Sequence, residues 1–522
     1  MSGEGTFIEG IALNAARYRE RVALKEGAKE LTYGELWELS GRVYASLYEE
    51  GLQAEDVVMV SVPGVIDAII AFLGILRAGA AFVICDPALG RDKRTYMYAD
   101  SGCRRLIDEQ VLVRMLEEEE RSGYEPREEH AAAYVIYTSG TTDLPKGVML
   151  ERGALTLSWD TFCYQGKHLV DEGSRNALLS PLTFAAGLIV VVCSLSSGGT
   201  LFVAPCEVLR NPLGLKEFFL TNAITHVFMT PSLYRTVRSF NPEMQRVFLG
   251  GEKVESIEET PSFRLYNSYA QSETGFLLTL YPIEKAMEEV PVGQPQGRAV
   301  EVRILDEDGK EVREGEVGEI CYENPYFRGY TDVKEEANQA LKKGLFHSGD
   351  MGRALPDGNI VLLGRKDEMV KINGIRVEPS AMEAAFRKVL PVREVRVRCL
   401  MEGNRVFICA YYTGEEELEV QKVRASLSEV LPSYMLPTHF FHLKEIPVNR
   451  NGKLDIESLP LPSMEPSGKE GVEGISESME GHMNSMEGLS KTEQEVSRII
   501  ARRGHESYGP SGQGYGPNLS GA

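Results

Sequence analysis

The chain has 522 residues, a formal net charge of -21 and 43% hydrophobic residues. At roughly 100–200 residues per domain, this length predicts more than one domain and a sizeable core. The acidic balance, 56 Lys and Arg against 77 Asp and Glu, argues against a nucleic-acid-binding protein, which carries a basic face. It does not exclude a phosphate ligand, because a few local groups are enough to bind one.

The sequence shows no targeting, membrane-spanning or metal-binding pattern. The N-terminus has no basic segment followed by an apolar run, so we expect no secretory signal and a cytoplasmic protein. The most apolar stretch, residues 187–195, is far shorter than the roughly 20 residues that span a bilayer, so we expect no membrane partner. The eight cysteines form no C-x-x-C pair. They predict buried, reduced thiols rather than a metal cluster.

The first part of the chain predicts α/β layers. Residues 65–77 have the apolar spacing of a helix. Short apolar runs indicate buried strands at residues 81–85, 201–204 and 224–229. Strands that alternate with helices are typical of an α/β fold. From about residue 301 the pattern changes to short strands with Gly and Asp turns, which predicts a small β-rich subdomain within an N-terminal domain of residues 1–366.

A second unit begins after this body. Short strands and one amphipathic helix predict a small α+β domain at residues 367–462, with elements at 375–377, 379–389, 392–399 and 406–412. The tail at residues 463–522 is rich in Gly, Ser, Glu and Met, so we expect it to be disordered. Residues 490–501 could form one short helix within it.

The clearest chemical signal is the segment YVIYTSGTTDLPKGVML at residues 134–150. An apolar strand runs into hydroxyls and glycine, and a lysine and a second apolar strand follow. Glycine lets backbone amides turn around an anion, and lysine supplies a point charge. The spacing is not that of the P-loop. The segment predicts a phosphate-binding loop formed by Thr138, Ser139, Gly140, Thr141, Thr142 and Lys146.

Further motifs lie on both sides of this loop. In chain order they are LTYGEL, ILRAGAAFVICDP, YTSGTTDLPKG, NSYAQSET, GEICYENPYFRGY, FHSGD, GRKDEMVKINGIRVEPSAME, LPSYMLP and NRNGKLD. From residue 31 to about 459 the chain therefore resembles the AMP-forming adenylate ligase superfamily, most closely the adenylation domains of nonribosomal peptide synthetases. That family joins a carboxylate to ATP, which gives acyl-AMP and pyrophosphate, and then passes the acyl group to a thiol. The resemblance implies ATP and Mg²⁺ as cofactors.

The resemblance assigns a role to each matching residue. Lys453 would contact the substrate carboxylate and the α-phosphate, where in-line attack builds negative charge. Glu273 would bind Mg²⁺, a cation that prefers carboxylate and phosphate oxygens. Asn267 would form a hydrogen bond with the edge of adenine, and Tyr269 would stack on its ring. Asp350 would accept hydrogen bonds from the ribose hydroxyls, and Arg365 would help to hold ribose and phosphate. Without the resemblance, Lys453 and Asp350 are typical of turns.

The resemblance also implies a conformational change. Asp367 matches the hinge about which the small domain is expected to rotate after adenylation. The rotation would remove Lys453 and bring the Gly374 segment to a thiol tunnel. By itself, Asp367 would be an ordinary polar linker residue.

Two positions depart from the family pattern. Asp143 stands in the phosphate loop where the family usually has Gly, and a carboxylate beside a triphosphate is unfavourable. Ala185 stands where amino-acid-activating members place an Asp that pairs with the substrate ammonium group. A buried ammonium without a partner is costly. We therefore expect an aryl or aliphatic acid without a free α-amino group, or one whose amino group is held elsewhere.

The other positions aligned to the substrate pocket are mostly apolar. They are Phe184, Ala186, Ile189, Phe228, Phe248, Gly250, Ser268, Phe276 and Leu277.

The thiol acceptor stays open. Residues 490–501 resemble the first helix of a phosphopantetheine carrier domain, but no carrier serine motif follows. We expect a separate carrier protein as the partner, with a truncated carrier as the other interpretation of the tail. A ligase that uses free coenzyme A is the alternative, since YAQSETG and FHSGD look closer to such enzymes. A luciferase-like oxygenase and a degenerate binding protein are further alternatives.

Overall fold

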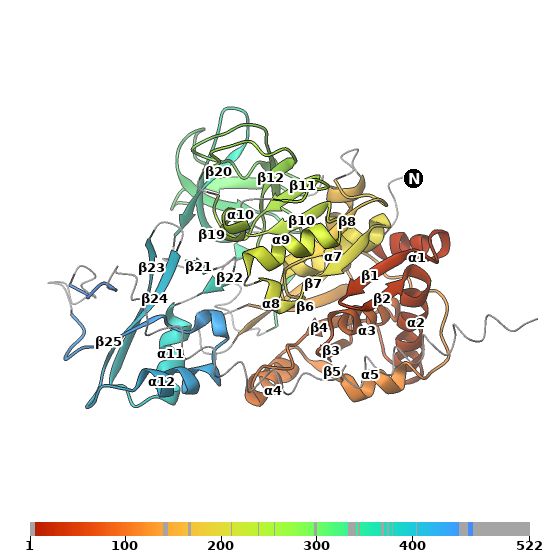
Figure 1. Cartoon of the computed structure of the whole chain (residues 1–522), viewed down its shortest axis with the longest axis horizontal. Coiled ribbons are helices and arrows are strands. Elements are labelled where there is room, and N and C mark those ends of the chain that lie inside the picture. Colours follow the sequence, from red (N-terminus) through yellow and green to blue (C-terminus); the bar gives the residue numbers. More distant parts are fainter. Residues whose placement is uncertain are drawn as a thin grey trace, which may run out of the picture.

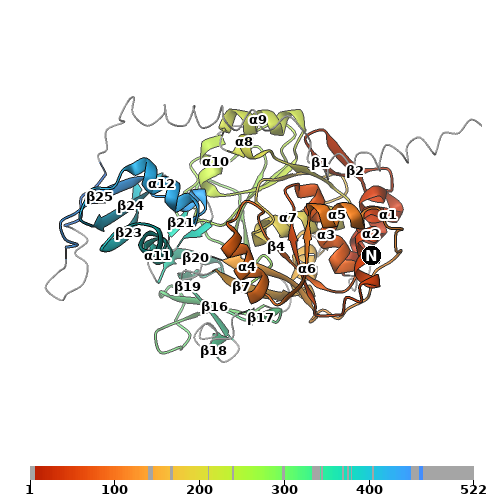
Figure 2. The ribbon, with the colours of Figure 1, turned by 90° about the horizontal axis from the view of Figure 1, so that it is seen from below.

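A computed structural model describes residues 6–138, 145–164, 169–209, 211–237, 240–254, 256–296, 300–331, 341–342, 345–366, 370–372, 375–377, 379–402, 405–447 and 458–462. Figure 1 shows a large body of helices and sheets with a smaller unit beside it, and Figure 2 shows the same arrangement from below. Among these residues, no helix is long and apolar enough to cross a membrane.

The larger sheet of the body is mostly parallel. Its strands run from one edge to the other as β14 (Gln294–Pro295), β13 (Thr279–Ile283), β12 (Arg264–Tyr269), β11 (Arg246–Leu249), β10 (His226–Met229), β8 (Arg175–Leu178), β9 (Thr200–Val203), β1 (Val22–Glu26) and β2 (Lys29–Thr32). The inner pairs from β1 to β12 are parallel, whereas β2, β13 and β14 pair antiparallel. The carboxyl ends of β8, β10, β11 and β12 therefore meet at one edge.

The second sheet of the body carries the predicted phosphate loop. Its strands are β17 (Phe327–Tyr330), β7 (Lys146–Glu151), β6 (Ala132–Thr138), β4 (Ala81–Ile84), β3 (Val57–Ser61) and β5 (Cys103–Asp108). β3, β4, β5 and β6 are parallel, and β7 turns back along β6. Every residue of β3 is buried, as expected for a strand covered on both faces.

Helices cover both sheets, and α3 (Val65–Arg77) and α7 (Ala185–Ser197) pack between them. One hydrophobic core joins these two helices to strands of both sheets, which explains why α3 is apolar around almost its whole circumference. The remaining helices of the body are α1 (Phe7–Arg17), α2 (Tyr33–Glu49), α4 (Arg91–Asp100), α5 (Glu109–Met115), α6 (Arg152–Trp159), the π-helix η1 (Asp160–Tyr164), α8 (Cys206–Leu209), α9 (Pro212–Thr221) and α10 (Pro231–Val237).

The LTYGEL motif begins α2. The Thr32 side chain accepts a hydrogen bond from the Glu35 amide, and the Glu35 carboxylate accepts one from the Thr32 amide. This capping box satisfies two amides that the first turn of a helix leaves without intrahelical partners. The motif therefore has a structural role at the end of β2.

The β-rich subdomain follows the larger sheet. It contains β15 (Val302–Leu305), β16 (Gly318–Tyr322), β18 (Leu341–Lys342), β19 (Leu345–Ala354) and β20 (Ile360–Arg365). All the pairings are antiparallel. β19 carries the FHSGD motif in the middle of this sheet, next to β16 and β20.

The small unit has a core of its own. It comprises β21 (Val370–Ile372), β22 (Ile375–Val377), α11 (Pro379–Val389), β23 (Glu394–Glu402), β24 (Arg405–Thr413), α12 (Val420–Ser428), the 3-10 turn η3 (Ser433–Met435) and β25 (His439–His442). Side chains of α11 and α12 pack on β23 and β24. Lys93 of α4 donates a hydrogen bond to the carbonyl of Val430, so the body contacts this unit beyond α12.

The predicted α/β class is confirmed, and the predicted helices at 65–77 and 379–389 have these bounds in the structure. The predicted domain boundary at Asp367 and the tail at residues 463–522 lie outside the described residues.

Candidate active site

Several of the predicted site residues lie where parallel strands end. Asn267, Ser268 and Tyr269 are the last residues of β12, and Thr138 is the last residue of β6. In open α/β sheets, ligands bind outside the carboxyl ends of the strands. The loop after β12 contains Glu273 and therefore lies at this edge.

The base of the phosphate loop is a hairpin between β6 and β7. Thr138 pairs with Lys146, and the Thr138 Oγ1 lies 3.5 Å from the Lys146 carbonyl oxygen. Behind this hairpin, Tyr137 and Thr331 both donate to the Asp100 carboxylate, at 2.7 Å and 2.5 Å. These bonds tie the end of β6 and the residue after β17 to α4, and the Thr331 amide also donates to the Gly147 carbonyl of β7 at 2.9 Å. Residues 139–144, which include the departure at Asp143, lie outside the described residues.

Glu273 is held beside this hairpin. Its side chain is buried, and Tyr330 donates a hydrogen bond to its Oε1 at 3.0 Å. Tyr330 belongs to β17 and pairs with Val148 of β7. Asn324 donates to the Glu273 backbone carbonyl at 2.6 Å. The motif GEICYENPYFRGY thus supplies two residues that position the predicted metal ligand next to the phosphate hairpin.

Gly275 sets the turn after Glu273. Its φ of +67° is in the left-handed region, and a Cβ atom at this position would lie 2.5 Å from the Tyr134 hydroxyl. The Tyr134 hydroxyl donates to the Gly275 carbonyl at 3.2 Å. Only glycine combines this backbone conformation with so close a neighbour.

Gln271 links three of the motifs. Its Nε2 and the Tyr269 hydroxyl both donate to Asp350 Oδ2, at 2.7 Å and 2.6 Å. The Tyr322 hydroxyl donates to Gln271 Oε1 at 3.0 Å. Burial, and then the negative charge of Glu273, raise the pKa of Tyr322 well above its ordinary value, so this hydroxyl stays a donor. Gln271 and Tyr322 were not predicted as site residues, and their only signal in the sequence is their position inside two of the motifs.

The hydrogen bonds from Tyr269 and Gln271 thereby orient the Asp350 carboxylate. Asp350 and Tyr269 are 2% and 3% exposed, so the Tyr269 ring offers little surface to a ligand in this structure. The predicted stacking of Tyr269 on adenine and the predicted ribose contact of Asp350 stay predictions. Asp350 pairs with Arg365 across β19 and β20, so the backbones of these two predicted nucleotide-binding residues lie opposite each other on neighbouring strands.

Asn267 has one satisfied and one unsatisfied polar atom. Its Nδ2 donates to the Pro291 carbonyl at 2.8 Å. Its Oδ1 is buried and has no hydrogen-bond partner among the residues that the structure describes. A buried acceptor without a partner costs about 1–3 kcal/mol. This is the expected state of a group whose partner arrives with a ligand.

Two aromatic residues of the predicted pocket, Phe228 and Phe248, form a ladder across the larger sheet together with Tyr266, which was not predicted. Phe228, Phe248 and Tyr266 pair in register on β10, β11 and β12. The ring centroids of Phe248 and Tyr266 are 5.0 Å apart, and Phe162 of η1 meets Phe248 edge-on at 5.2 Å. Ile189 of α7 packs against the same cluster.

Gly250 and Ser268 lie at the end of this ladder. A Cβ atom on Gly250 would lie 2.6 Å from Ser268 Oγ and 2.9 Å from Phe228 Cζ. Ser268 Oγ donates to the Leu249 carbonyl at 2.6 Å. Phe276, in contrast, is fully buried in a different core with Tyr269 and Tyr322. Its neighbour Leu277 packs with the aromatic ladder instead.

Phe184 and Ala185 begin α7. Phe184 is the N-cap residue and provides no side-chain cap, and the first turn contains no acidic residue. Ala185 is buried. A helix N-terminus carries partial positive charge, which disfavours a cation and favours an anion.

Comparisons with known proteins agree with these motifs. The model of the family described as "AMP-binding enzyme" matches residues 11–331, more than half of the chain. The chain belongs to the AMP-binding enzyme family.

Curated relatives of this AMP-binding enzyme are much longer. This chain is 31% identical over 476 residues to bacitracin synthase 1 of Bacillus licheniformis. The match covers 86% of this chain and 9% of that protein. This chain is also 30% identical over 482 residues to gramicidin S synthase 2 of Brevibacillus brevis. That match covers 85% of this chain and 11% of that protein. The chain thus spans about a tenth of the length of these relatives.

Solved structures share the fold. The TM-score is 0.74 at 21% identity with NpsA-ThdA, an artificially fused adenylation-PCP di-domain NRPS from Klebsiella oxytoca, over 83% of this chain and 93% of that chain. The TM-score is 0.73 at 20% identity with o-succinylbenzoate CoA synthetase from Bacillus subtilis, over 85% of this chain and 96% of that chain. These likenesses confirm the expected architecture of an AMP-binding enzyme.

The remaining predicted residues of this AMP-binding enzyme lie outside what the structure describes. They are the phosphate-loop residues Ser139, Gly140, Thr141 and Thr142, the catalytic Lys453, the hinge Asp367 and the thiol-tunnel Gly374. The roles of these residues stay predictions.

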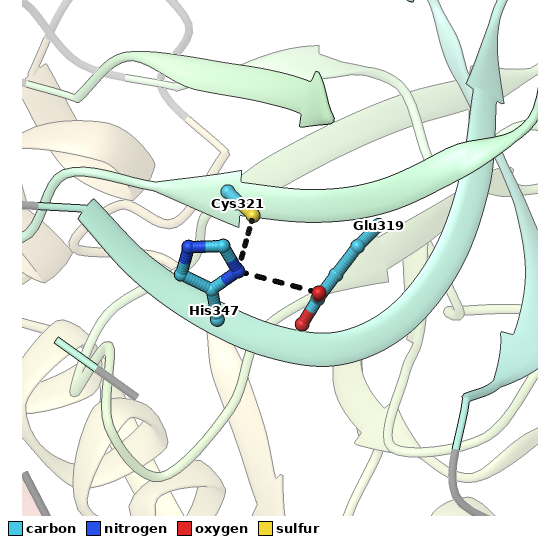
Figure 3. A group of neighbouring side chains, drawn as sticks. All are labelled: Glu319, Cys321 and His347. Atoms are coloured by element: carbon cyan, nitrogen blue, oxygen red, sulfur yellow. Dashed lines mark hydrogen bonds and ion pairs between the residues drawn. The ribbon is translucent and has the colours of Figure 1, made fainter. Parts of the chain in front are cut away.

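One group of side chains was missed by the sequence analysis. Glu319, Cys321 and His347 lie together on β16 and β19, with potential ligand atoms within 4.8 Å of one another (Figure 3). The expectation that the cysteines mark no metal site rested on spacing along the chain. It could not detect this group, because two of the residues come from one strand and the third from a distant strand.

Proposed function

We propose that this AMP-binding enzyme activates a carboxylic acid with ATP and transfers the acyl group to the phosphopantetheine thiol of a separate carrier protein. In the first step, a carboxylate oxygen would attack the α-phosphorus, which forms acyl-AMP and releases pyrophosphate. In the second, the thiol would displace AMP. The family match carries the proposal, together with the gathering of its motif residues at one edge of the sheets.

The chain has polar groups that suit ATP. The buried Asn267 Oδ1 has no hydrogen-bond partner among the described residues, and it would accept a hydrogen bond from the exocyclic amino group of adenine. Guanine has an oxygen at that position, so the same atom would disfavour GTP. Lys146 stands at the base of the predicted phosphate loop and would add positive charge.

Glu273 suits a hard cation. It is a buried carboxylate beside the phosphate hairpin, held by Tyr330. Mg²⁺ is usually bound by one or two carboxylates together with substrate phosphates, and it would neutralise charge on the phosphate oxygens. Asn324 and Tyr330 would keep Glu273 in place for this role.

We propose Lys453 as the catalytic residue. It would stabilise the negative charge that develops between the carboxylate and the α-phosphate. Replacing Lys453 with Ala should abolish acid-dependent pyrophosphate exchange, while ATP binding measured by calorimetry largely survives. Equal loss of binding and exchange would contradict this role.

The proposed substrate is an aryl or aliphatic acid without a free α-amino group. The aromatic ladder of Phe228, Phe248 and Tyr266 supports an apolar acid. At the start of α7, Ala185 offers no charge for an ammonium group, and the helix N-terminus opposes one. Both observations favour an acid that carries no positive charge.

The similarity to NpsA-ThdA, an artificially fused adenylation-PCP di-domain NRPS, supports the carrier protein as the acceptor. The similarity to a CoA synthetase keeps coenzyme A as the second candidate.

The test is ATP–pyrophosphate exchange across a panel of aryl, aliphatic and amino acids. We expect exchange with an aryl or aliphatic acid and little with α-amino acids. The active acid is then offered with coenzyme A or with a holo-carrier protein, and the acylated product is detected by mass spectrometry. Efficient acyl-CoA formation would favour the second candidate, and failure to exchange with any acid would contradict both.

A further inference from the structure

A possible cation site lies in the β-rich subdomain, formed by Glu319, Cys321 and His347. Cys321 and His347 are directly opposite each other in the antiparallel pair of β16 and β19. Glu319 is two residues before Cys321 and therefore lies on the same face of β16. Figure 3 shows the three side chains converging between the two strands. Neighbouring strands thus bring together a thiol, an imidazole and a carboxylate.

The distances centre on one nitrogen. His347 Nδ1 lies 3.4 Å from Cys321 Sγ and 3.3 Å from Glu319 Oε2. A ring nitrogen has either one proton or one lone pair, so it cannot make a linear hydrogen bond to both neighbours. A cation between the three atoms could be coordinated by one lone pair from each of them.

These distances match the edges of a zinc tetrahedron. Zn–S and Zn–N bonds of about 2.3 and 2.0 Å at tetrahedral angles separate the sulfur from the nitrogen by roughly 3.5 Å. Zn–N and Zn–O bonds of about 2.0 Å separate the nitrogen from the oxygen by roughly 3.3 Å. The observed 3.4 Å and 3.3 Å agree with these two edges, and the sulfur and the carboxylate oxygen lie within 4.8 Å of each other.

The donor set selects the metal. Thiolate and imidazole suit zinc, whereas Mg²⁺ and Ca²⁺ prefer oxygen ligands. Cys321 is fully buried, and the side chains of Glu319 and His347 are 12% and 22% exposed, so an ion could enter from the side of these two residues. Three protein ligands would leave a fourth position for water.

We propose that Glu319, Cys321 and His347 bind one Zn²⁺ ion, separately from the Mg²⁺ that would accompany ATP. The site would couple to the nucleotide region, because Glu319 Oε1 accepts a hydrogen bond from the Gly349 amide at 3.0 Å, one residue before Asp350. Lys366 Nζ lies 3.3 Å from Glu319 Oε2 and competes with the metal for this oxygen.

The test uses Co²⁺ as a spectroscopic probe for zinc on the full, reduced chain. Binding should give one equivalent per chain, with a thiolate-to-cobalt charge-transfer band and the intense visible absorption of tetrahedral cobalt, and Zn²⁺ should displace it. Cys321→Ser should remove the charge-transfer band. Cys206→Ser is the matched control, because Cys206 is an exposed cysteine on α8, and this variant should keep the band.

Replacing the buried Cys321 could prevent folding, so two further variants test the site at less buried positions. His347→Gln and Glu319→Gln change side chains at the exposed side of the site and should weaken Co²⁺ binding at least tenfold with unchanged near-ultraviolet circular dichroism. Lys366→Ala should tighten binding, because it removes the competing ammonium. Absence of a thiolate band at saturating Co²⁺, or a band that persists in Cys321→Ser, would overturn the proposal.

Discussion

At the scale of single residues, the candidate site combines satisfied and unsatisfied groups. Tyr269 and Gln271 both donate hydrogen bonds to the Asp350 carboxylate, and these bonds fix the end of β12 against β19. Asn267 Oδ1, in contrast, is buried without a partner among the described residues. The first arrangement preorganises the site, and the second identifies the group that a ligand would complete.

Asn267→Ala should weaken ATP binding about tenfold, because one hydrogen bond in a buried site contributes roughly 0.5–1.5 kcal/mol. Discrimination against GTP should fall at the same time, since the variant removes the acceptor that would face the guanine oxygen. Calorimetric titration with both nucleotides measures this. Equal weakening of ATP and GTP would contradict the adenine contact.

Ala185→Asp should shift the substrate preference. A carboxylate at the start of α7 would pair with an ammonium group, so α-amino acids should gain pyrophosphate exchange and the native acid should lose about tenfold in kcat/KM. Ser197→Asp places the same charge at the other end of α7, outside the predicted pocket, and is the control. Similar profiles for the two variants would argue against a specific role of position 185.

At the scale of elements, strand β10 contains a buried histidine with a defined protonation state. His226 Nδ1 lies 2.7 Å from Thr225 Oγ1, and its Nε2 lies 2.9 Å from Arg246 Nη1. A guanidinium only donates, so Nε2 accepts and the ring is neutral. Burial, and then the charge of Arg246, lower the pKa of His226 to about 4.

This histidine should make stability depend on pH. The unfolded chain protonates His226 below its ordinary pKa of about 6.5, whereas the folded chain resists protonation until about pH 4. Stability should therefore fall as pH decreases through this window, by up to about 3 kcal/mol. His226→Gln should show a smaller loss of thermal stability between pH 7 and pH 5 than the wild type. His442→Gln, at an exposed position of β25, should behave like the wild type.

At the scale of the whole molecule, the body and the small unit meet at α4. Lys93 donates to the Val430 carbonyl, and Gly90 packs close to the Glu429 carbonyl, where an added Cβ atom would lie 3.2 Å from its oxygen. Burial, and then the charge of Lys388, lower the pKa of Lys93. The hydrogen bond of the half-buried Lys93 to the Val430 carbonyl is a contact that a rotating unit would have to break.

Lys93→Ala should loosen the small unit at this contact. A hydrogen bond from a charged group contributes roughly 1.5–3 kcal/mol, so amides near Val430 should exchange with deuterium about tenfold faster or more. Lys422→Ala is the control, because Lys422 lies on α12 but faces solvent. Unchanged exchange in Lys93→Ala would show that this contact does not hold the unit.

Much of the fold followed from local patterns. The helix at Val65–Arg77 was predicted from its apolar spacing, and the strands around it from short apolar runs. The motifs also indicated which residues would gather at the candidate site. Sequence offsets were less reliable inside the pocket: Phe276 was expected there, yet the turn at Gly275 directs Phe276 into another core and Leu277 toward the aromatic ladder.

The α/β class, the family resemblance and the identity of the motif residues follow from local sequence, because periodicity and motifs are properties of neighbouring residues. Which distant groups meet depends on the three-dimensional fold. Gln271 reaches Asp350 across 79 residues of chain, and Cys321 meets His347 because β16 and β19 pair in that register. Strand register brings such groups together regardless of their separation in sequence, so no local pattern could have predicted a site at Glu319, Cys321 and His347.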